Sequence, residues 1–241
     1  MDQSRSFVLP GQNRILSSLP RDLQLQLLPR MEKISLSVKQ ILYDPGATIT
    51  HAWFPLSGVI SLIISLKSGE TVEVATVGNE GVAGTPLLLG RERGPLRALC
   101  QVAGQALRMR AEHFWRSLEE HPEFSGIVRR YAQGLFDQIA QTTACNHVHS
   151  VRERMCRWLL TTHDRVGGDE FHLTQELLAQ MLGVRRPSVT VAAGELQKAG
   201  FIQYQRGHIR IADRAGLEAS ACECYDSQRH DFDRLFSQPP S

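Results

Sequence analysis

The segment from Thr174 to Ala199 constrains the fold most, because its apolar, small and turn residues fit two short helices that cross at a tight turn. Leu178 and Leu182 lie four residues apart and form the buried face of the first helix. Ala179 is small where the second helix crosses, and Gly183 supplies the positive φ of the turn. The segment therefore predicts a helix-turn-helix.

The second helix is expected to continue to about Lys198. Pro187 is tolerated in its first turn, where backbone N–H groups have no intrahelical partner, and Val189 packs back against the first helix. A helix in this position enters the major groove of DNA, and its first residues meet bases and phosphates. Arg186 is the expected base reader, because arginine can bond guanine at two atoms. The candidate DNA-binding residues are Thr174, Arg185, Arg186, Ser188, Thr190, Val191, Arg206 and His208.

Residues 200–211 follow directly and alternate between apolar and polar side chains on both sides of Arg206 and Gly207. This pattern predicts a β-hairpin wing whose tip contacts the DNA backbone. A helical hairpin with a trailing β-hairpin and no DNA-binding role is the alternative, since arginines alone do not exclude it.

The N-terminal half has a different pattern. Short helices are expected over residues 13–31, and from Ile34 to Arg110 short runs of Ile, Val, Leu and Thr alternate with turns. The clearest hairpin joins 59–66 to 71–77 across a turn at 67–70. So many strands in so short a segment predict a jelly-roll-like β domain, and the whole chain an α+β fold.

A long helix is expected from Phe124 to Thr142, and a further one from Ser150 to about His163. The long helix has one apolar face, made by Phe124, Ile127, Val128, Tyr131, Leu135 and Ile139. Two interpretations remain: this face packs on the β domain of its own chain, or it forms a dimer seam. The dimer seam is preferred, with Gly134 allowing close helix approach.

Composition sets the remaining limits. The chain has 241 residues, and 42% of them are hydrophobic, which is enough to bury a core. Its net charge is only +2, so any surface that binds nucleic acid must be a local patch of positive charge. Five scattered cysteines, the polar start at 1–5 and the absence of a long apolar run favour a cytoplasmic protein without a membrane segment. The expected domains are a sensor at 1–121, a dimerisation helix at 122–147 and a winged helix at 148–241.

From about Leu16 to Leu217, and most specifically from Leu173 to Ile211, the chain resembles the Crp/Fnr family of bacterial regulators. The resemblance implies a cyclic-nucleotide-binding-like β roll, a long dimerisation helix and a winged helix that binds palindromic DNA as a homodimer. RNA polymerase is a further expected partner. Where family members carry Arg-Glu-x-x-x-Arg, Pro187 replaces the glutamate and Val191 the second arginine, so the family's operator is not carried over. Val191 can instead meet a thymine methyl group.

The residues expected to bind an effector also differ from those of the family. Thr85 and Pro86 stand where cyclic-AMP-binding members carry Glu-Leu, so cyclic-nucleotide binding is not expected, although Arg93 or Arg97 could reach a phosphate. The resemblance places a candidate effector pocket at Gly84, Thr85, Arg93 and Arg97. No cysteine precedes Cys100, which excludes the family's N-terminal iron–sulfur centre. Haem is not expected either, although His51, His113 and His121 are available.

Two other classes of function have weaker support. Cys222 and Cys224 with His230 make too weak a pattern for a metal site, so no metal or cofactor is expected. No nucleophile and base stand at a recognisable spacing, so no enzyme is expected. A ligand-sensing adaptor that uses the winged helix to bind protein is the alternative to the DNA-binding regulator.

Overall fold

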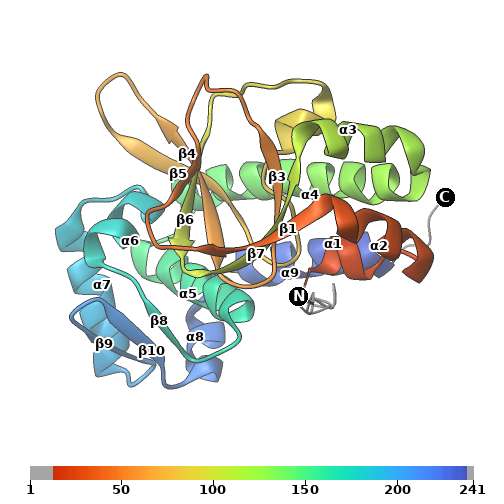
Figure 1. Cartoon of the computed structure of the whole chain (residues 1–241). Coiled ribbons are helices and arrows are strands. Elements are labelled where there is room, and N and C mark those ends of the chain that lie inside the picture. Colours follow the sequence, from red (N-terminus) through yellow and green to blue (C-terminus); the bar gives the residue numbers. More distant parts are fainter. Residues whose placement is uncertain (1–12, 238–241) are drawn as a thin grey trace, which may run out of the picture.

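The computed structural model describes residues 13–237, and its N-terminal half is built on two antiparallel β-sheets (Figure 1). The first has the strand order β1-β7-β3 and the second β2-β6-β4-β5. The strands are β1 (Met31–Leu36), β2 (Ile41–Tyr43), β3 (His51–Pro55), β4 (Val59–Ser65), β5 (Thr71–Val77), β6 (Arg97–Val102) and β7 (Gly104–Arg110). Apolar residues of both sheets share one core, and the predicted β domain and its hairpin at 59–77 are confirmed.

Four helices flank this β domain. They are α1 (Arg14–Ser17), α2 (Arg21–Leu27), α3 (Ala111–Glu120) and α4 (Pro122–Val148). Two 3-10 helices accompany them: η2 (Leu28–Arg30) follows α2, and η3 (Thr85–Leu89) lies beside α3 and α4. Three aromatic rings pack together between the helices and the sheets. Phe114 of α3 and Phe124 of α4 each lie 6.3 Å from Phe54 of β3, centroid to centroid, and 5.8 Å from each other in an edge-to-face pair.

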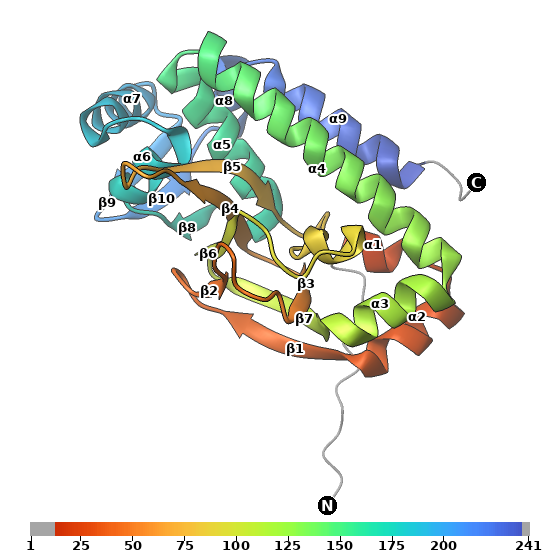
Figure 2. The same cartoon turned by 90° about the horizontal axis from the view of Figure 1, so that it is seen from above.

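The apolar face of α4 is buried within its own chain, so the preferred dimer-seam interpretation was wrong for these residues. Phe124, Ile127, Val128, Tyr131 and Leu135 belong to the core of the β domain. The alternative interpretation, that this face packs on the β domain of its own chain, is confirmed. The sheets and the C-terminal helix together offer enough apolar surface to cover it. Figure 2 shows that helix, α9 (Cys224–Ser237), lying beside α4.

Gly134 does allow a close approach, but to α9 and not to a second copy. A Cβ atom added at Gly134 would lie 2.6 Å from Leu235 Cδ1 and 3.4 Å from a ring carbon of Phe232, both on α9. The glycine therefore lets the two antiparallel helices pack closely. The pattern in the sequence indicated a close helix contact without indicating its partner.

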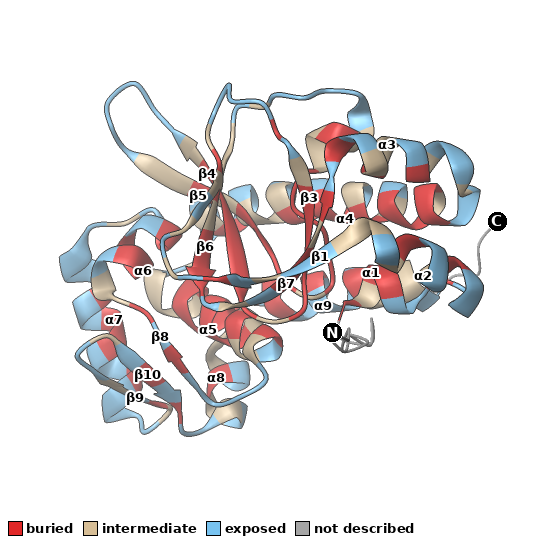
Figure 3. Ribbon diagram, viewed as in Figure 1, coloured by how far each residue is buried: buried red, intermediate tan, exposed pale blue. Residues whose placement is uncertain are grey.

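The C-terminal half is a small helical unit with a three-stranded sheet. Its elements are α5 (Val151–Val166), β8 (Glu170–His172), α6 (Gln175–Leu182), α7 (Arg186–Lys198), β9 (Ile202–Gln205), β10 (His208–Ile211) and α8 (Arg214–Ser220). Ser150 and Glu153 form a capping box that starts α5 immediately after the end of α4. Buried residues line the inner faces of these helices and continue into β4 and β6 (Figure 3), so the two halves share a core. Within residues 13–237, the helices are too short or too polar to cross a bilayer.

A buried ion pair joins the two halves. Arg165 of α5 donates to both carboxylate oxygens of Glu80, at 2.6 Å from Nη2 and 3.1 Å from Nε, and also to the hydroxyl of Thr76. Both side chains are less than a tenth exposed, at 6% and 7%. Gly78 leaves the space that the arginine stem occupies, because a Cβ atom there would lie 2.3 Å from Arg165 Cδ. The orientation of α5 on the β domain therefore depends on this pair.

A buried carboxyl group lies at the same junction. Glu73 of β5 accepts hydrogen bonds from Ser61 at 2.5 Å and from the indole N–H of Trp158, on α5, at 3.1 Å. Burial raises the pKa of Glu73 to about 7, and these two hydrogen bonds oppose the shift only in part. Burial therefore makes the folded state more stable when Glu73 is protonated, because the cost of burying the carboxylate exceeds the gain from its two hydrogen bonds.

We predict that the free energy of unfolding decreases as the pH rises from about 4.5 to about 7. The folded-state pKa of Glu73 lies above its unfolded value, so its contribution is complete below about pH 4.5 and lost above about pH 7. The loss is on the order of 3 kcal/mol for a shift of this size. Measured as the free energy of unfolding against pH, Glu73→Gln should lack this dependence. Glu70→Gln, at the exposed tip of the same hairpin, should keep it; a wild-type slope in Glu73→Gln contradicts the assignment.

Candidate nucleic-acid interface

The helix-turn-helix predicted from the sequence is present as α6 and α7. The hydroxyl of Thr174 accepts a hydrogen bond from the N–H of Leu177 and caps α6, and Gly183 ends that helix with φ of 61°. Leu178, Ala179 and Leu182 are buried, as expected for the face that meets α7. The tight crossing follows from a small residue and a left-handed turn in the predicted places.

The second helix, α7, divides into a buried and an exposed face. Its buried face consists of Val189, Ala192, Ala193 and Leu196. At its start, Arg185, Arg186 and Ser188 are exposed, and Pro187 stands in the first turn as predicted. Val191, one turn further, is an apolar side chain that is 63% exposed. The exposed face of α7 therefore carries two positive charges at its start and one apolar side chain, Val191, a turn later.

Thr190, a predicted DNA contact, already has partners within the chain. Its hydroxyl donates to Gln175 Oε1 at 2.9 Å and lies 3.2 Å from the carbonyl of Arg186. This hydrogen bond places Gln175, the first residue of α6, beside the exposed face of α7. Gln175 is not among the residues predicted from the sequence, although its position in the first turn of α6, next to Thr174, is a local signal for it.

The wing is confirmed as strands β9 and β10 joined by Arg206 and Gly207. Both turn residues have positive φ, 49° and 80°, and Gln205 pairs directly with His208 across the turn. This is the two-residue hairpin whose twist matches its strands. Arg206 and His208 are exposed at the tip, and the ring of His172 on β8 packs edge-on against His208, with 5.0 Å between centroids.

The wing lies beside the start of α7. Tyr204 of β9 donates its hydroxyl to the carbonyl of Leu173 at 2.8 Å. Burial raises the pKa of Tyr204 to about 12, and the positive charge of Arg186 opposes that rise, so the Arg186 side chain lies near the base of the wing. Among residues 13–237, Arg185, Arg186 and Arg206 have no carboxylate within ion-pair distance. We call the exposed residues that carry these three arginines, at the start of α7 and at the tip of the wing, the α7–wing face.

The residues predicted for an effector pocket have separate surroundings. Gly84 begins η3 with φ of 107°, Thr85 follows it, Arg93 is exposed in a loop, and Arg97 pairs with Asp44 at 2.7 Å. No contact described for residues 13–237 brings the four together, so this pocket stays a prediction.

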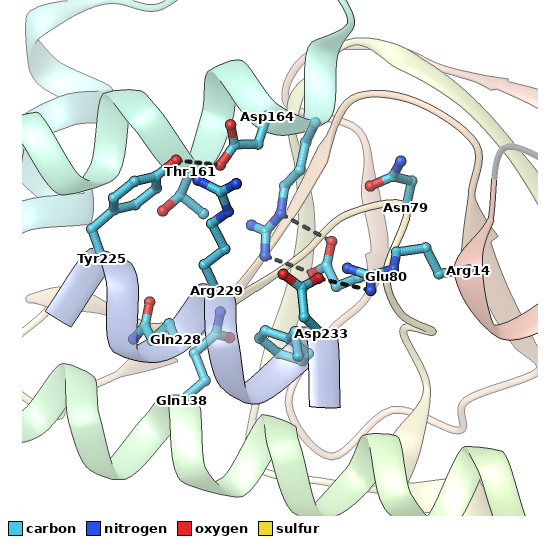
Figure 4. Close-up of a pocket in the computed structure, with 12 residues that line it drawn as sticks. Arg14, Asn79, Glu80, Gln138, Thr161, Asp164, Tyr225, Gln228, Arg229 and Asp233 are labelled. Atoms are coloured by element: carbon cyan, nitrogen blue, oxygen red, sulfur yellow. Dashed lines mark hydrogen bonds and ion pairs between the residues drawn. The ribbon is translucent and has the colours of Figure 1, made fainter. Parts of the chain in front are cut away.

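A cavity of about 230 Å³ lies instead at the junction of the two halves (Figure 4). Its wall carries charges of both signs: Arg14 pairs with Asp233 at 2.9 Å, and the hydroxyl of Tyr225 donates to Asp164 at 2.9 Å. The buried pair of Arg165 and Glu80 forms its floor. A polar ligand in this cavity would touch the β domain, α5 and α9 at once.

A winged helix-turn-helix with an exposed cationic first turn, docked on a β domain through buried charges, defines the class of DNA-binding transcription regulators. Comparison with known proteins shows what the chain is similar to. Residues 153–220 match the family model of the Crp-like helix-turn-helix domain. The global nitrogen regulator of Synechocystis sp. is 25% identical over 229 residues, which cover 90% of this chain and 98% of that protein.

Solved structures share the fold. FixK2 from Bradyrhizobium japonicum superposes with a TM-score of 0.67 at 14% identity, over 80% of this chain and 98% of FixK2. A Crp/Fnr-family regulator from Eubacterium rectale gives a TM-score of 0.66 at 15% identity, over 87% of this chain and 98% of that one. Residues 153–220 thus carry a Crp-like helix-turn-helix domain, the chain is similar to Crp/Fnr regulators over most of its length, and it is a DNA-binding transcription regulator.

Proposed function

We propose that the chain binds a specific, two-fold palindromic DNA sequence as a homodimer in the cytoplasm, and that a signal received by the β domain changes this binding. The α7–wing face carries the proposal, because it offers arginines without carboxylate partners at the end of a helix whose other face is buried. Arg186 reads a base, Arg185, Ser188 and Arg206 meet phosphates, and Val191 meets a thymine methyl group. RNA polymerase is the partner expected of the bound regulator.

Dimerisation is assigned to the outward face of α4, since the inward face is occupied. A stripe at alternating steps of four and three residues runs along this face and is exposed throughout. It consists of Arg129, Gln133, Phe136, Ala140, Thr143 and His147. This is the spacing of a coiled-coil seam, and Phe136 is 65% exposed at its centre. A second copy of α4 packed here would bury that ring.

Signal transfer is assigned to the junction between the halves. Arg165 and Glu80 couple α5 to the loop that follows β5, and α5 carries the helix-turn-helix. A ligand that moves this loop, or that enters the junction cavity, would change the pose of α7.

For base reading, we predict that Arg186→Ala loses discrimination among sites. DNA sequences selected from a random pool should bind the variant about 10- to 100-fold more weakly, while random fragments bind almost as before. Lys198→Ala, at the far end of the same helix, is the matched control and should keep selectivity. Unchanged selectivity in Arg186→Ala contradicts the assignment of Arg186 as the reader.

For the wing, we predict an effect on salt dependence instead of sequence preference. Removing one phosphate contact should reduce the slope of log K against log salt concentration by about 0.9. Arg206→Asn is the suitable variant, because asparagine tolerates the positive φ of 49° at this position. Arg21→Asn, an exposed arginine on α2, should leave the slope unchanged. A flat salt dependence in the wild type would favour a protein-binding adaptor.

For dimerisation, we predict that Phe136→Glu shifts the protein from dimer to monomer at micromolar concentration. Two glutamates facing each other across the seam would repel and lose the apolar contact. Sedimentation equilibrium measures the change, and Leu89→Glu, an apolar side chain 72% exposed on η3, is the control. An unchanged dimer in Phe136→Glu would move the interface away from α4.

A further inference from the structure

Four potential metal ligands meet at the point where α4 ends and α9 begins. Cys145 lies in the last turn of α4 and His149 caps that helix, while Cys222 precedes α9 and Cys224 is its first residue. The three sulfur atoms and one ring nitrogen all lie within 4.8 Å of one another. All three cysteines are buried and free, at 0%, 4% and 1% exposure. His230, which follows them in the sequence, is exposed and does not belong to this group.

The spacing of these atoms suits one tetrahedral ion. Four ligands bound to Zn²⁺ at Zn–S distances of about 2.3 Å would place their sulfur atoms about 3.8 Å apart. Cys145 Sγ and Cys222 Sγ are 3.6 Å apart, and Cys224 Sγ lies 3.7 Å from His149 Nδ1. An iron–sulfur cluster would hold the cysteines further apart, because its inorganic sulfides lie between them.

The surroundings orient the ligands in the way metal sites require. His149 Nε2, the ring nitrogen not facing the sulfurs, lies 3.1 Å from a carboxylate oxygen of Glu223. This contact fixes the tautomer that leaves Nδ1 free to bind a metal. On the other side, the amide of Gln141 donates to Cys224 Sγ at 3.0 Å. In metal sites, a ligand histidine usually donates its second ring N–H to a carboxylate, and neighbouring groups form hydrogen bonds with the other ligands.

The charges also match. Three thiolates, one neutral imidazole and Zn²⁺ carry a net charge of −1, which must be balanced when the site is buried. Arg154 and Arg157 of α5 are buried nearby, at 6% and 8% exposure, and the Nε of each lacks a hydrogen-bond partner within residues 13–237. Arg154 Nη1 donates to Asn146 Oδ1, next to Cys145 in the chain, at 2.8 Å, and Arg157 Nη1 donates to Gln228 Oε1 of α9 at 3.4 Å. Two cations thus face a cluster that becomes anionic on binding metal.

We infer that Cys145, His149, Cys222 and Cys224 bind one Zn²⁺ ion in a closed, four-ligand structural site. Binding releases the thiol protons, and the two pairs of ligands come from segments more than seventy residues apart. The ion would therefore clamp the start of α9 onto the hinge between α4 and α5, which consists of His149 and Ser150. This metal site is independent of the proposed DNA contacts.

The test uses the full-length protein produced with zinc and purified under reducing conditions. Elemental analysis should find about one zinc per chain. Cys145→Ser and Cys222→Ser should each lose most of it, whereas Cys156→Ser, a buried cysteine of α5 outside the cluster, should keep it. Equal metal content in Cys145→Ser and the wild type would overturn the proposal, as would a wild type that takes up no zinc. DNA binding is not part of this readout.

A second measurement covers variants that fold poorly. Replacing zinc by Co²⁺ should give the intense visible bands of tetrahedral cobalt and a thiolate-to-cobalt charge-transfer band. His149→Cys should still bind one ion and increase that charge-transfer band by about a third, because four thiolates then replace three. A weak octahedral spectrum in the wild type, or no change in band intensity in His149→Cys, would overturn the assignment of these ligands.

Discussion

The buried ion pair between Arg165 and Glu80 is the constraint on which the arrangement of the two halves depends. Neither side chain can be removed alone without leaving an isolated charge at less than a tenth exposure, a loss of about 3–5 kcal/mol. The pair is bidentate, so it fixes direction as well as distance. Glu73 and Trp158 add a second polar contact across the same junction, and apolar residues of β4 and β6 complete it. The helix-turn-helix is carried by α5 and therefore inherits its pose from these contacts.

The parts of the fold that the sequence predicted are those set by neighbours in the chain. The crossing of α6 and α7 follows from Ala179, Gly183 and Val189, and the wing from the two-residue turn at Arg206 and Gly207. In each case the determining residues lie within a few positions of one another. The periodicity of α4 correctly marked its buried face, yet periodicity does not identify what covers a face. The covering surface comes from β strands before α4 and from α9 after it, which only the tertiary structure reveals.

In the candidate site too, local sequence patterns predict some features, and others depend on contacts between distant segments. Exposure of Arg185, Arg186 and Val191 follows from the helical repeat once Val189 is placed inside. The bond between Thr190 and Gln175 joins two helices, and no local pattern predicts it. The cysteine cluster is the extreme case, because Cys145 and Cys222 share a site only through the packing of α9 along α4. In the sequence Cys222 and Cys224 had His230 as the nearest histidine, and helical geometry instead turns His230 to the surface.

One helix, α4, connects all of these features. Its inward face is fixed by the β domain and by α9, its outward face carries the exposed stripe around Phe136, and its last turn supplies Cys145 to the cluster. A rigid helix cannot shift on one face without moving the other. A change in the β domain that displaces α4 must therefore alter the proposed dimer seam and the hinge at His149 and Ser150 together. A metal ion at the end of α4 would hold the start of α9 to the hinge, so that a displacement of α4 would pass directly to α5 and the helix-turn-helix it carries.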